Sequence, residues 1–451
     1  TGLRLAERME LAEPKGLPPI SRQQRRVVRM VLEGGESVFF TGSAGTGKSR
    51  TLHEIVRRAD AASTWTTALT GIAASALPRA TTLHYFAGIG LGKGPFEQVL
   101  DNVMRNGSRV RSWRRCKLLV IDEASMMSQR LFELLEFLAR RIRGSELPFG
   151  GIQLCLCGDF FQLPPVARGR GPDSRFCFES EQWERCVARS IELTTVYRQK
   201  DPRLLQLLRE VRFNCVSEDS LCLLRQLSRD LRVDAGILPT RLHAANVAVD
   251  RINAQHLAGL EGDARIYRAE DQPPHAAEQL NNLTLFPQYL ELKVGAQVMM
   301  LKKCGDLVNG SRGVVTDFEC SGPMELPVVK WLCGQVSVVT RQESQRETTQ
   351  GVLRRLQLPL KLCWAMTIHK SQGMSVDFLQ VDLADVFEKG QAYVALSRAR
   401  SLEGLQVCSF DPNRFGVDPR VEEFYRHCVR LEEEGDPGDD EVEEWDREDG
   451  A

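Results

Sequence analysis

An eight-residue segment near the start of the chain constrains its fold more than any other feature. The segment fits the pattern G-x-x-x-x-G-K-[ST] and consists of Gly42, Ser43, Ala44, Gly45, Thr46, Gly47, Lys48 and Ser49. It follows a short apolar strand pattern at residues 37–41 and precedes a helical pattern over residues 52–58. In this arrangement backbone N–H groups surround phosphate oxygens at the N-terminus of a helix. We therefore predict a nucleotide-binding loop, in which Lys48 reaches the β and γ phosphates and Ser49 binds Mg²⁺.

Two adjacent acids end another apolar run. Residues 118–121 are all apolar and lead directly to Asp122 and Glu123. A strand would carry Asp122 to the carboxyl edge of a sheet, where it can hold Mg²⁺, and Glu123 can orient and deprotonate an attacking water. Alone, such a pair is often only a solvated strand end, but together with the phosphate-binding loop it predicts hydrolysis. A kinase would need an acceptor pocket, and no motif for one is evident.

Strand and helix patterns alternate along most of the chain, which indicates an α/β fold with parallel sheets. A first core is predicted over residues 20–195, with an insertion at about 84–115, and a second core over residues 196–430. Short β runs with glycine turns predict a small β-barrel inserted at about 294–360. Residues 1–19 are predicted to form an N-terminal arm, and residues 431–451 an acidic, disordered tail.

Three further side chains are candidates for contact with a γ phosphate. Gln162 follows the apolar run at 154–157 and precedes two prolines, so it either senses the γ phosphate or is a polar turn residue. Phosphoryl transfer also needs positive charge at the γ phosphate, often an arginine from a neighbouring domain. Arg198 and Arg398 are candidates for that role. Taken singly, either arginine is more often a surface ion pair, since the chain has 59 basic residues.

These motifs, in this order, resemble superfamily-one DNA helicases of the RecD branch, most closely the Pif (petite integration frequency) family. The resemblance covers most of the chain, from about residue 21 to residue 400, and its most specific segments are 42–49, 121–126, 158–165, 192–199, 367–373 and 393–399. It implies two RecA-like parallel-sheet cores, with a wedge insertion in the first and the small β-barrel in the second. Family members use ATP and Mg²⁺ and unwind DNA in the 5′ to 3′ direction.

The resemblance also assigns roles to individual residues. Residues 20–24 are similar to an adenine-reading glutamine motif, in which Gln24 stands in the reading position, although an acid is more usual where Gln23 stands. Arg198 and Arg398 would be the γ-phosphate arginines, and Gly373 would lie near the nucleotide. The segment over residues 192–213 is similar to the signature region that separates the Pif family from RecD itself.

Contacts to single-stranded DNA are predicted in several of the matched segments. Such binding needs hydrogen-bond donors to the backbone, positive charge and exposed aromatic faces. The predicted contacts are Thr67, Thr70, Gly71, Thr82, His84, Phe161, His369, Lys370 and Ser371. His84 is also compatible with a core position. A basic stretch in the first insertion is either a solvated face or a contact to duplex phosphates, and it comprises Arg105, Arg109, Arg111, Arg114 and Arg115.

Charge is distributed unevenly along the chain. The 451 residues carry 59 Lys and Arg against 60 Asp and Glu, for a net charge of −1. Residues 432–451 hold twelve acids and one base, so they carry −11 and the rest of the chain carries +10. A net charge of +10 on residues 1–431 suits a protein that moves along a phosphate backbone. The tail is either a solubilising end or an acidic segment that competes with DNA for a basic groove.

Composition excludes other classes of protein. No uncharged apolar run approaches the roughly 18 residues that suggest a membrane span, so no membrane partner is expected. Thirteen cysteines without any C-x-x-C pair argue against a zinc site and for reduced thiols, and Cys155 and Cys157 are predicted to be core residues.

The functional hypothesis is an ATP-dependent DNA helicase that moves 5′ to 3′ on single-stranded DNA and unwinds duplex, forked and G-quadruplex DNA. By resemblance it would act as a monomer in DNA repair, recombination and telomere maintenance, in the nucleus and the mitochondrion. Two alternatives remain at this point. One is a nucleotide-dependent ATPase that binds or remodels nucleic acid without unwinding it, and the other is an RNA helicase.

Overall fold

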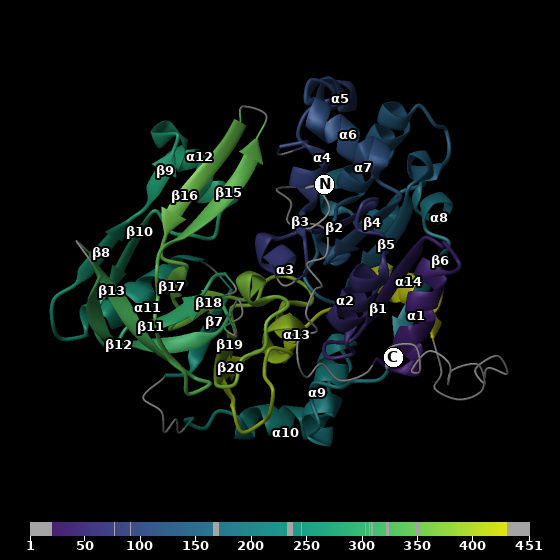
Figure 1. Cartoon of the computed structure of the whole chain (residues 1–451). Helices are drawn as coiled ribbons and strands as arrows, with labels where there is room; N and C mark the ends of the chain where they lie inside the picture. Colours follow the sequence, from purple (N-terminus) through teal and green to yellow (C-terminus); the bar gives the residue numbers. More distant parts are fainter. Residues whose placement is uncertain are drawn as a thin grey trace, which may run out of the picture.

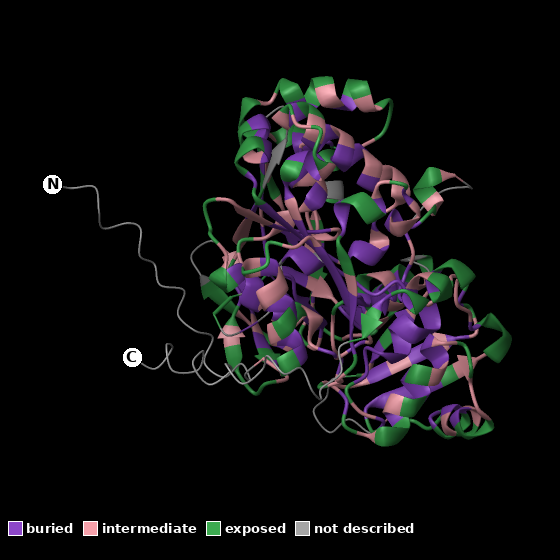
Figure 2. Cartoon of the chain, turned by 90° about the vertical axis from the view of Figure 1, so that its right-hand side faces the viewer, coloured by how far each residue is buried: buried purple, intermediate pink, exposed green. Residues whose placement is uncertain are grey.

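The computed structural model describes residues 20–430 except residues 76, 91, 166–170, 232–237, 245, 303, 306, 308–309, 322–323 and 349–350. The predicted N-terminal arm and acidic tail therefore lie outside the described residues. Buried residues concentrate along the strands of the sheets, whereas exposed residues cover the outer helices (Figure 2). Within the described part of the chain, no helix combines the length and the apolar character that crossing a membrane requires.

The first core is built on a parallel sheet of seven strands in the order β21-β6-β1-β5-β4-β2-β3 (Figure 1). Parallel sheets are covered on both faces, and strands β1 and β4 are accordingly buried along their whole length. The strands are β1 (Val38–Gly42), β2 (Thr64–Ala68), β3 (Thr81–Thr82), β4 (Leu118–Asp122), β5 (Gln153–Cys157), β6 (Arg189–Leu193) and β21 (Val429–Arg430).

Alternating side chains send successive residues of these strands to opposite faces. Val38 and Phe40 belong to one hydrophobic cluster, while Phe39 between them belongs to another. Cys155 and Cys157 are fully buried in the first of these clusters, which confirms their predicted core position. The helices of this core are α1 (Arg22–Leu32), α2 (Lys48–Arg58), α3 (Gly71–Ser75), α7 (Gln129–Arg143) and α8 (Trp183–Cys186).

The first insertion consists of three short helices at the top of Figure 1, of which the second and third pack against α7 and the first packs against the third. They are α4 (Leu83–Ala87), α5 (Phe96–Met104) and α6 (Gly107–Arg115). The fully buried Trp113 anchors α6, with its ring centroid 4.9 Å from that of Phe86. The predicted basic stretch begins directly after α5 and continues along α6. It is not uniformly solvated, because Arg109 is mostly buried and its guanidinium carbon lies 3.9 Å from the centre of the Tyr85 ring.

The second core has a parallel sheet of four strands in the order β18-β7-β19-β20. These strands are β7 (Thr240–His243), β18 (Ala365–Thr367), β19 (Leu379–Leu383) and β20 (Leu405–Phe410). Its helices are α9 (Pro202–Arg212), α10 (Glu218–Gln226), α11 (Asn246–Ala258) and α13 (Gln391–Leu396). Helix α13 is buried along its whole length and leads into the segment that carries Arg398.

The second insertion begins upstream of the predicted start at residue 294. It contains a five-stranded antiparallel sheet in the order β14-β13-β12-β11-β17, with β14 and β17 as its edges among the described residues, and two smaller sheets, β15-β16-β9 and β10-β8. Its elements are β8 (Arg265–Arg268), β9 (Glu270–Gln272), α12 (Ala277–Leu283), β10 (Tyr289–Leu292), β11 (Gln297–Met300), β12 (Arg312–Ser321), β13 (Met324–Trp331), β14 (Val336–Val338), β15 (Gln342–Thr348), β16 (Gly351–Gln357) and β17 (Leu360–Leu362).

The last described residues depart from the predicted boundary of the second core. Helix α14 (Pro419–Arg426) and strand β21 follow the second core in the chain, yet β21 pairs in parallel with β6, with Val429 opposite Ile191. The edge of the first sheet offers unpaired backbone groups that this short strand satisfies. The C-terminal end of the predicted 196–430 core thus belongs to the first core.

Candidate nucleotide and nucleic-acid site

The phosphate-binding loop runs from the end of β1 to the start of α2. Gly47 precedes the helix with φ of 81°, in the left-handed region that glycine adopts without strain. A Cβ added to Gly47 would lie 2.2 Å from Nε2 of Gln24. The backbone conformation therefore favours glycine at this position, and any side chain would also have to displace the amide of Gln24.

Lys48 folds back over the loop that precedes it. Its Nζ donates hydrogen bonds to the carbonyl oxygens of Gly42, at 2.7 Å, and Ser43, at 3.1 Å. Burial lowers the pKa of Lys48, while the charges of Asp159 and Glu123 oppose that shift. The predicted phosphate-binding ammonium is thus held at the loop among acidic side chains of the neighbouring strands.

Asp122 and Glu123 stand at the carboxyl end of β4, next to β5 in the same sheet. Burial, reinforced by the charge of Glu123, raises the pKa of Asp122 to about 7. The Oδ1 atom of Asp122 accepts a hydrogen bond from the backbone N–H of Glu123 at 2.8 Å. Glu123 itself has φ of 55°, a backbone conformation that is costly for a residue with a side chain and is typical of functional sites.

The donor chemistry here suits Mg²⁺. Mg²⁺ usually takes one or two carboxylates with phosphate oxygens and water rather than a full protein cage. Ser49 in the first turn of α2 and Asp122 at the end of β4 supply one hydroxyl and one carboxylate. Among the described residues, no group of three or more His, Cys, Asp or Glu side chains could hold a metal ion by itself. The residues present therefore fit a metal that arrives with a nucleotide.

Gln162 lies beside a buried acid in the loop that follows β5. Its Nε2 donates to Oδ2 of Asp159 at 3.3 Å, and its backbone N–H donates to the Asp159 carbonyl at 2.9 Å. Asp159 is fully buried. Burial alone would raise the pKa of Asp159, but the charges of Arg212 and Lys48 bring it below its ordinary value. Gln162 thus belongs to the same charged network as the P-loop lysine.

The two predicted arginines come from the second-core side and lie near one another. Arg398 is 2% exposed and donates hydrogen bonds to the Val394 and Met374 carbonyls, at 3.0 and 3.2 Å. Burial and the charge of Arg198 lower the pKa of Arg398 to about 10. The Nη1 atom of Arg198 is buried without a hydrogen-bond partner among the described residues. A buried, unpartnered guanidinium nitrogen is suited to an anionic ligand such as phosphate.

The second core also contacts the P-loop directly. The hydroxyl of Tyr393 accepts a hydrogen bond from the backbone N–H of Ala44 at 2.8 Å. The Nε2 atom of Gln372 donates to Oε2 of Glu123 at 2.8 Å. Gly373, next in the chain, has φ of 79°, and a Cβ on it would lie 3.5 Å from Oε1 of Glu123. Gly373 thus lies beside Glu123, and its position near the nucleotide stays a prediction.

Gln372 and Tyr393 lie within the family-like segments 367–373 and 393–399, but the sequence alone assigns a role to neither. Their contacts identify both as candidate site residues, and motif membership was the only signal available for them.

Gln24 lies against the P-loop, and both the oxygen and the nitrogen of its side-chain amide are hydrogen-bonded within the protein. Its Oε1 accepts from the backbone N–H of Ser21 at 2.9 Å, within the capping box of α1, and its Nε2 donates to the Thr46 carbonyl at 3.2 Å. Ser21 thus caps α1. Gln23 is hydrogen-bonded to Thr194 instead. The adenine-reading role of Gln24 stays a prediction.

Three of the predicted DNA contacts lie inside the protein. Thr67 is fully buried and donates to the Val120 carbonyl at 2.8 Å, and Ser371 is fully buried and donates to the Ile368 carbonyl at 2.7 Å. Phe161 is 4% exposed, with its ring 5.0 Å from that of Phe213 and 4.5 Å from that of Tyr425. Base stacking needs an exposed aromatic face, so this packing contradicts the stacking role predicted for Phe161.

The other predicted DNA contacts lie on both cores. Thr70 and Gly71 stand at the start of α3, where the Thr70 hydroxyl accepts from the backbone N–H of Ala73 at 3.1 Å. Thr82 precedes α4, and burial lowers the pKa of His84 within that helix. On the second core, the 3₁₀ turn η6 (His369–Ser371) carries Lys370, and Nε2 of His369 lies 2.9 Å from Glu388.

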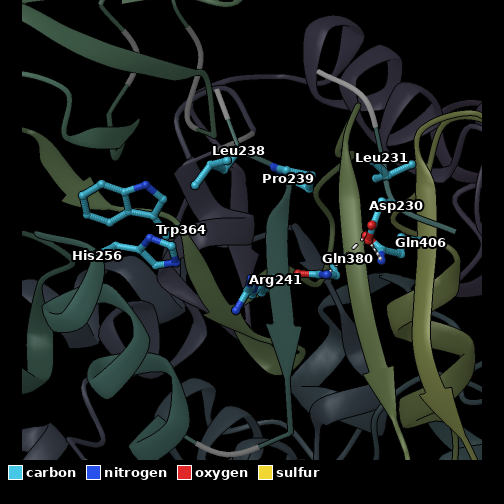
Figure 3. Close-up of a pocket in the computed structure, with 9 residues that line it drawn as sticks. All are labelled: Asp230, Leu231, Leu238, Pro239, Arg241, His256, Trp364, Gln380 and Gln406. Carbon is cyan, nitrogen blue, oxygen red and sulfur yellow. Dashed lines mark hydrogen bonds between the residues drawn. The ribbon is translucent and has the colours of Figure 1, made fainter. Parts of the chain in front are cut away.

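A cavity of about 170 Å³ lies apart from this site, at the amino ends of the second-core strands (Figure 3). Arg241, Gln380 and Gln406, each the second residue of its strand, line it together with the stacked rings of His256 and Trp364. In parallel sheets ligands bind beyond the carboxyl ends of the strands. This cavity is therefore at the opposite edge from the predicted nucleotide site.

The P-loop lies beside an acidic strand end and near arginines and a glutamine from loops outside the first sheet. This arrangement, with a second parallel sheet, defines a P-loop NTPase with two RecA-like cores. The family model "PIF1-like helicase" matches residues 19–212, and "DNA helicase Pif1, 2B domain" matches residues 277–318. The chain belongs to the PIF1-like helicase family.

Relatives and solved structures agree with this assignment. The ATP-dependent DNA helicase PIF1 of Homo sapiens is 46% identical over 419 residues, which cover 92% of this chain and 65% of that protein. The ATP-dependent DNA helicase RRM3 of Saccharomyces cerevisiae is 36% identical, over 91% of this chain and 68% of that protein. The Pif1 helicase structure from Candida albicans has a TM-score of 0.81 and 39% identity, covering 91% of this chain and 99% of that one.

A Bacteroides Pif1 helicase in complex with ADP-AlF3 and ssDNA has a TM-score of 0.67 and 27% identity, covering 91% of this chain and 97% of that chain. The present chain spans less than two thirds of the length of the first vertebrate relatives, 65% of the human protein and 64% of that of Danio rerio.

Proposed function

We propose that the chain is an ATP- and Mg²⁺-dependent DNA helicase that moves 5′ to 3′ along single-stranded DNA and unwinds duplex ahead of it. One observation carries the proposal: residues of both cores meet at the P-loop. Glu123 at the end of β4 is hydrogen-bonded to Gln372, and the Ala44 N–H in the P-loop is hydrogen-bonded to Tyr393. A site assembled from two cores couples a change in the nucleotide to relative motion of those cores.

Each side chain has a distinct part in hydrolysis. Lys48 and the P-loop N–H groups would bind the phosphates, and Ser49 and Asp122 would hold Mg²⁺, which neutralises developing charge on the phosphate oxygens. Glu123 would orient and deprotonate the attacking water. Arg198 and Arg398 would stabilise the transition state electrostatically, and Gln162 would report whether the γ phosphate is present.

The DNA would cross both cores, on the surfaces that carry Thr70, His84 and Lys370. Thr70 belongs to the first core, His84 to the insertion in that core and Lys370 to the second core. Opening and closing of the cores would therefore change the spacing between two contacts with the strand. Solved structures of relatives support this class of substrate, since Bacteroides Pif1 was crystallised bound to ssDNA and another structure concerns unwinding at forked dsDNA by two coordinating Pif1 helicases.

The proposal extends to the biological role that family membership suggests. The chain would act on forked and G-quadruplex DNA in genome maintenance, including repair, recombination and telomere maintenance, in the nucleus and the mitochondrion. It would be a monomer in solution, and pairing of two copies would occur on DNA.

The test is an ATPase assay with and without single-stranded DNA. We expect strong stimulation by DNA in the intact chain, and loss of hydrolysis in Lys48→Ala. Lys93→Ala is the matched control, because Lys93 is an exposed lysine in another glycine-rich segment that lacks the P-loop pattern. Absence of DNA stimulation would refute a DNA motor, and stronger stimulation by RNA than by DNA would favour an RNA helicase.

A further inference from the structure

The segment after β20 leaves the second core and returns to the first. It passes through the 3₁₀ turn η7 (Pro412–Arg414), helix α14 and strand β21, which pairs with β6. Figure 1 places α14 among the strands of the first core. The side chain of Arg430 on β21 adds an ion pair with Glu192 on β6, at 3.1 Å. The C-terminal segment is thus attached to the core that carries the P-loop.

The hydroxyl of Tyr425 on α14 has three hydrogen-bond partners, all in the first core. It donates to Oδ1 of Asp159 at 3.1 Å and accepts from the backbone N–H of Phe160 at 3.2 Å. It also lies 2.5 Å from the hydroxyl of Thr41. Because the single tyrosine proton goes to a carboxylate, the stronger acceptor, the Thr41 hydroxyl must be the donor in the third bond. The oxygen of Tyr425 is then fully used.

These partners lie on two segments of the predicted hydrolytic site. Thr41 is the residue of β1 directly before Gly42, where the P-loop begins. Asp159 belongs to the loop after β5, and its other oxygen accepts from Nε2 of Gln162 at 3.3 Å. Tyr425 therefore connects the strand that carries the P-loop to the acid that holds the predicted γ-phosphate sensor.

Other residues of the segment attach it independently of that hydroxyl. The Phe424 ring stacks on that of Phe178, with centroids 4.4 Å apart, and lies edge-on to Phe39 at 5.8 Å. The Tyr425 ring itself packs 4.5 Å from Phe161. Removal of the hydroxyl alone would leave these apolar contacts in place, so the positioning effect can be separated from docking of the helix.

We propose that Tyr425 is a positioning residue for nucleotide hydrolysis, which holds Asp159, and through it Gln162, in a fixed relation to the start of the P-loop. The inference rests on the proposed function and adds to it a dependence of turnover on the C-terminal segment. Tyr425 would not touch the nucleotide itself, so it acts on the rate of hydrolysis and not on nucleotide affinity.

The test compares the intact chain with Tyr425→Phe and with Tyr267→Phe as a matched control. Tyr267 is also a buried tyrosine, 5% exposed, and its hydroxyl donates to the Glu325 carbonyl at 2.9 Å in the second insertion. Both changes remove one buried, hydrogen-bonded hydroxyl. We expect Tyr425→Phe to lower kcat for DNA-stimulated ATP hydrolysis about tenfold, with the KM for ATP changed less than threefold. Tyr267→Phe should keep the kcat of the unmodified chain.

Amide hydrogen exchange gives a second readout that does not depend on catalysis. The Phe160 N–H loses its acceptor in Tyr425→Phe, so peptides covering residues 159–162 should exchange faster in that variant and not in Tyr267→Phe. An unchanged kcat or unchanged exchange in Tyr425→Phe would overturn the inference. If the unmodified chain hydrolyses no ATP, the proposed function fails, whereas normal hydrolysis matched by Tyr425→Phe refutes only the positioning role.

Discussion

Replacement of Gln372 by alanine tests how the second core acts on the hydrolytic site. The side chain is 6% exposed, and its Nε2 donates to Oε2 of Glu123 at 2.8 Å. A hydrogen bond to a charged group contributes about 1.5 to 3 kcal/mol, which corresponds to about a 10- to 150-fold change in rate if the bond acts in the transition state. Glu123 is half-buried, so water can replace part of the lost bond. We therefore expect the lower end, about a tenfold fall in kcat.

Gln372→Ala should reduce the DNA-stimulated rate of ATP hydrolysis more than it reduces the basal rate. Gln372 directly follows the turn η6, which carries the predicted DNA contacts His369 and Lys370. In Gln372→Ala, no hydrogen bond from residue 372 would connect DNA bound at η6 to Glu123. The assay is steady-state ATP hydrolysis titrated with single-stranded DNA, with the KM for ATP measured in parallel.

Gln406→Ala provides the control for this experiment. Gln406 is 7% exposed and hydrogen-bonded to Gln380 and Asp230, but it lines the cavity at the opposite edge of the second sheet (Figure 3). It should keep full DNA stimulation. If Gln372→Ala retains both its kcat and its stimulation, or if Gln406→Ala loses them equally, the bond between Gln372 and Glu123 does not transmit the DNA signal.

Two further predictions concern α2 and the loop before it. Gly47→Ala should abolish ATP hydrolysis and lower Tm, because a Cβ would meet Nε2 of Gln24 at 2.2 Å on a backbone with φ of 81°; Gly107→Ala, with its nearest neighbour at 3.5 Å and an ordinary φ, should do neither. The second prediction concerns Glu54 on α2. Burial alone would raise the pKa of Glu54, but hydrogen bonds from three arginines of α2 outweigh burial and lower that pKa to about 2. Its stabilising effect is therefore complete above its ordinary value of 4.5 and falls as pH drops toward 2. At pH 7, Glu54→Gln should unfold at a lower urea concentration than the unmodified chain. The difference between their urea midpoints should shrink as the pH falls. A difference that does not change with pH would contradict the lowered pKa of Glu54.

The parts of the site that depend on local sequence could be predicted. The spacing of the P-loop residues dictates a strand, a glycine turn and a helix, and the apolar run before Asp122 dictates a buried strand that ends at the sheet edge. Both arrangements involve residues that are neighbours in the chain. Lys48, Asp122 and Glu123 accordingly lie close enough for their charges to affect one another.

Roles that depend on distant residues could not be predicted in the same way. Phe161 belongs to a matched motif, but its burial is decided by Phe213 and Tyr425, which approach from other parts of the chain. The short segment of α14 and β21 carries no periodic signal that would assign it to the first sheet, because the unpaired edge of β6 determines its place. Gln372 gains its role from a hydrogen bond to Glu123, which lies 249 positions earlier in the chain.

The most direct test of the account is strand displacement on partial duplexes that carry a single-stranded tail at either the 5′ or the 3′ end. We expect the chain to separate the 5′-tailed duplex when ATP and Mg²⁺ are present and to leave the 3′-tailed duplex intact, and we expect Lys48→Ala to separate neither. Unwinding from 3′ tails alone would contradict the direction of movement. DNA-stimulated hydrolysis without displacement of either strand would show that the two cores serve a remodelling ATPase and not a helicase.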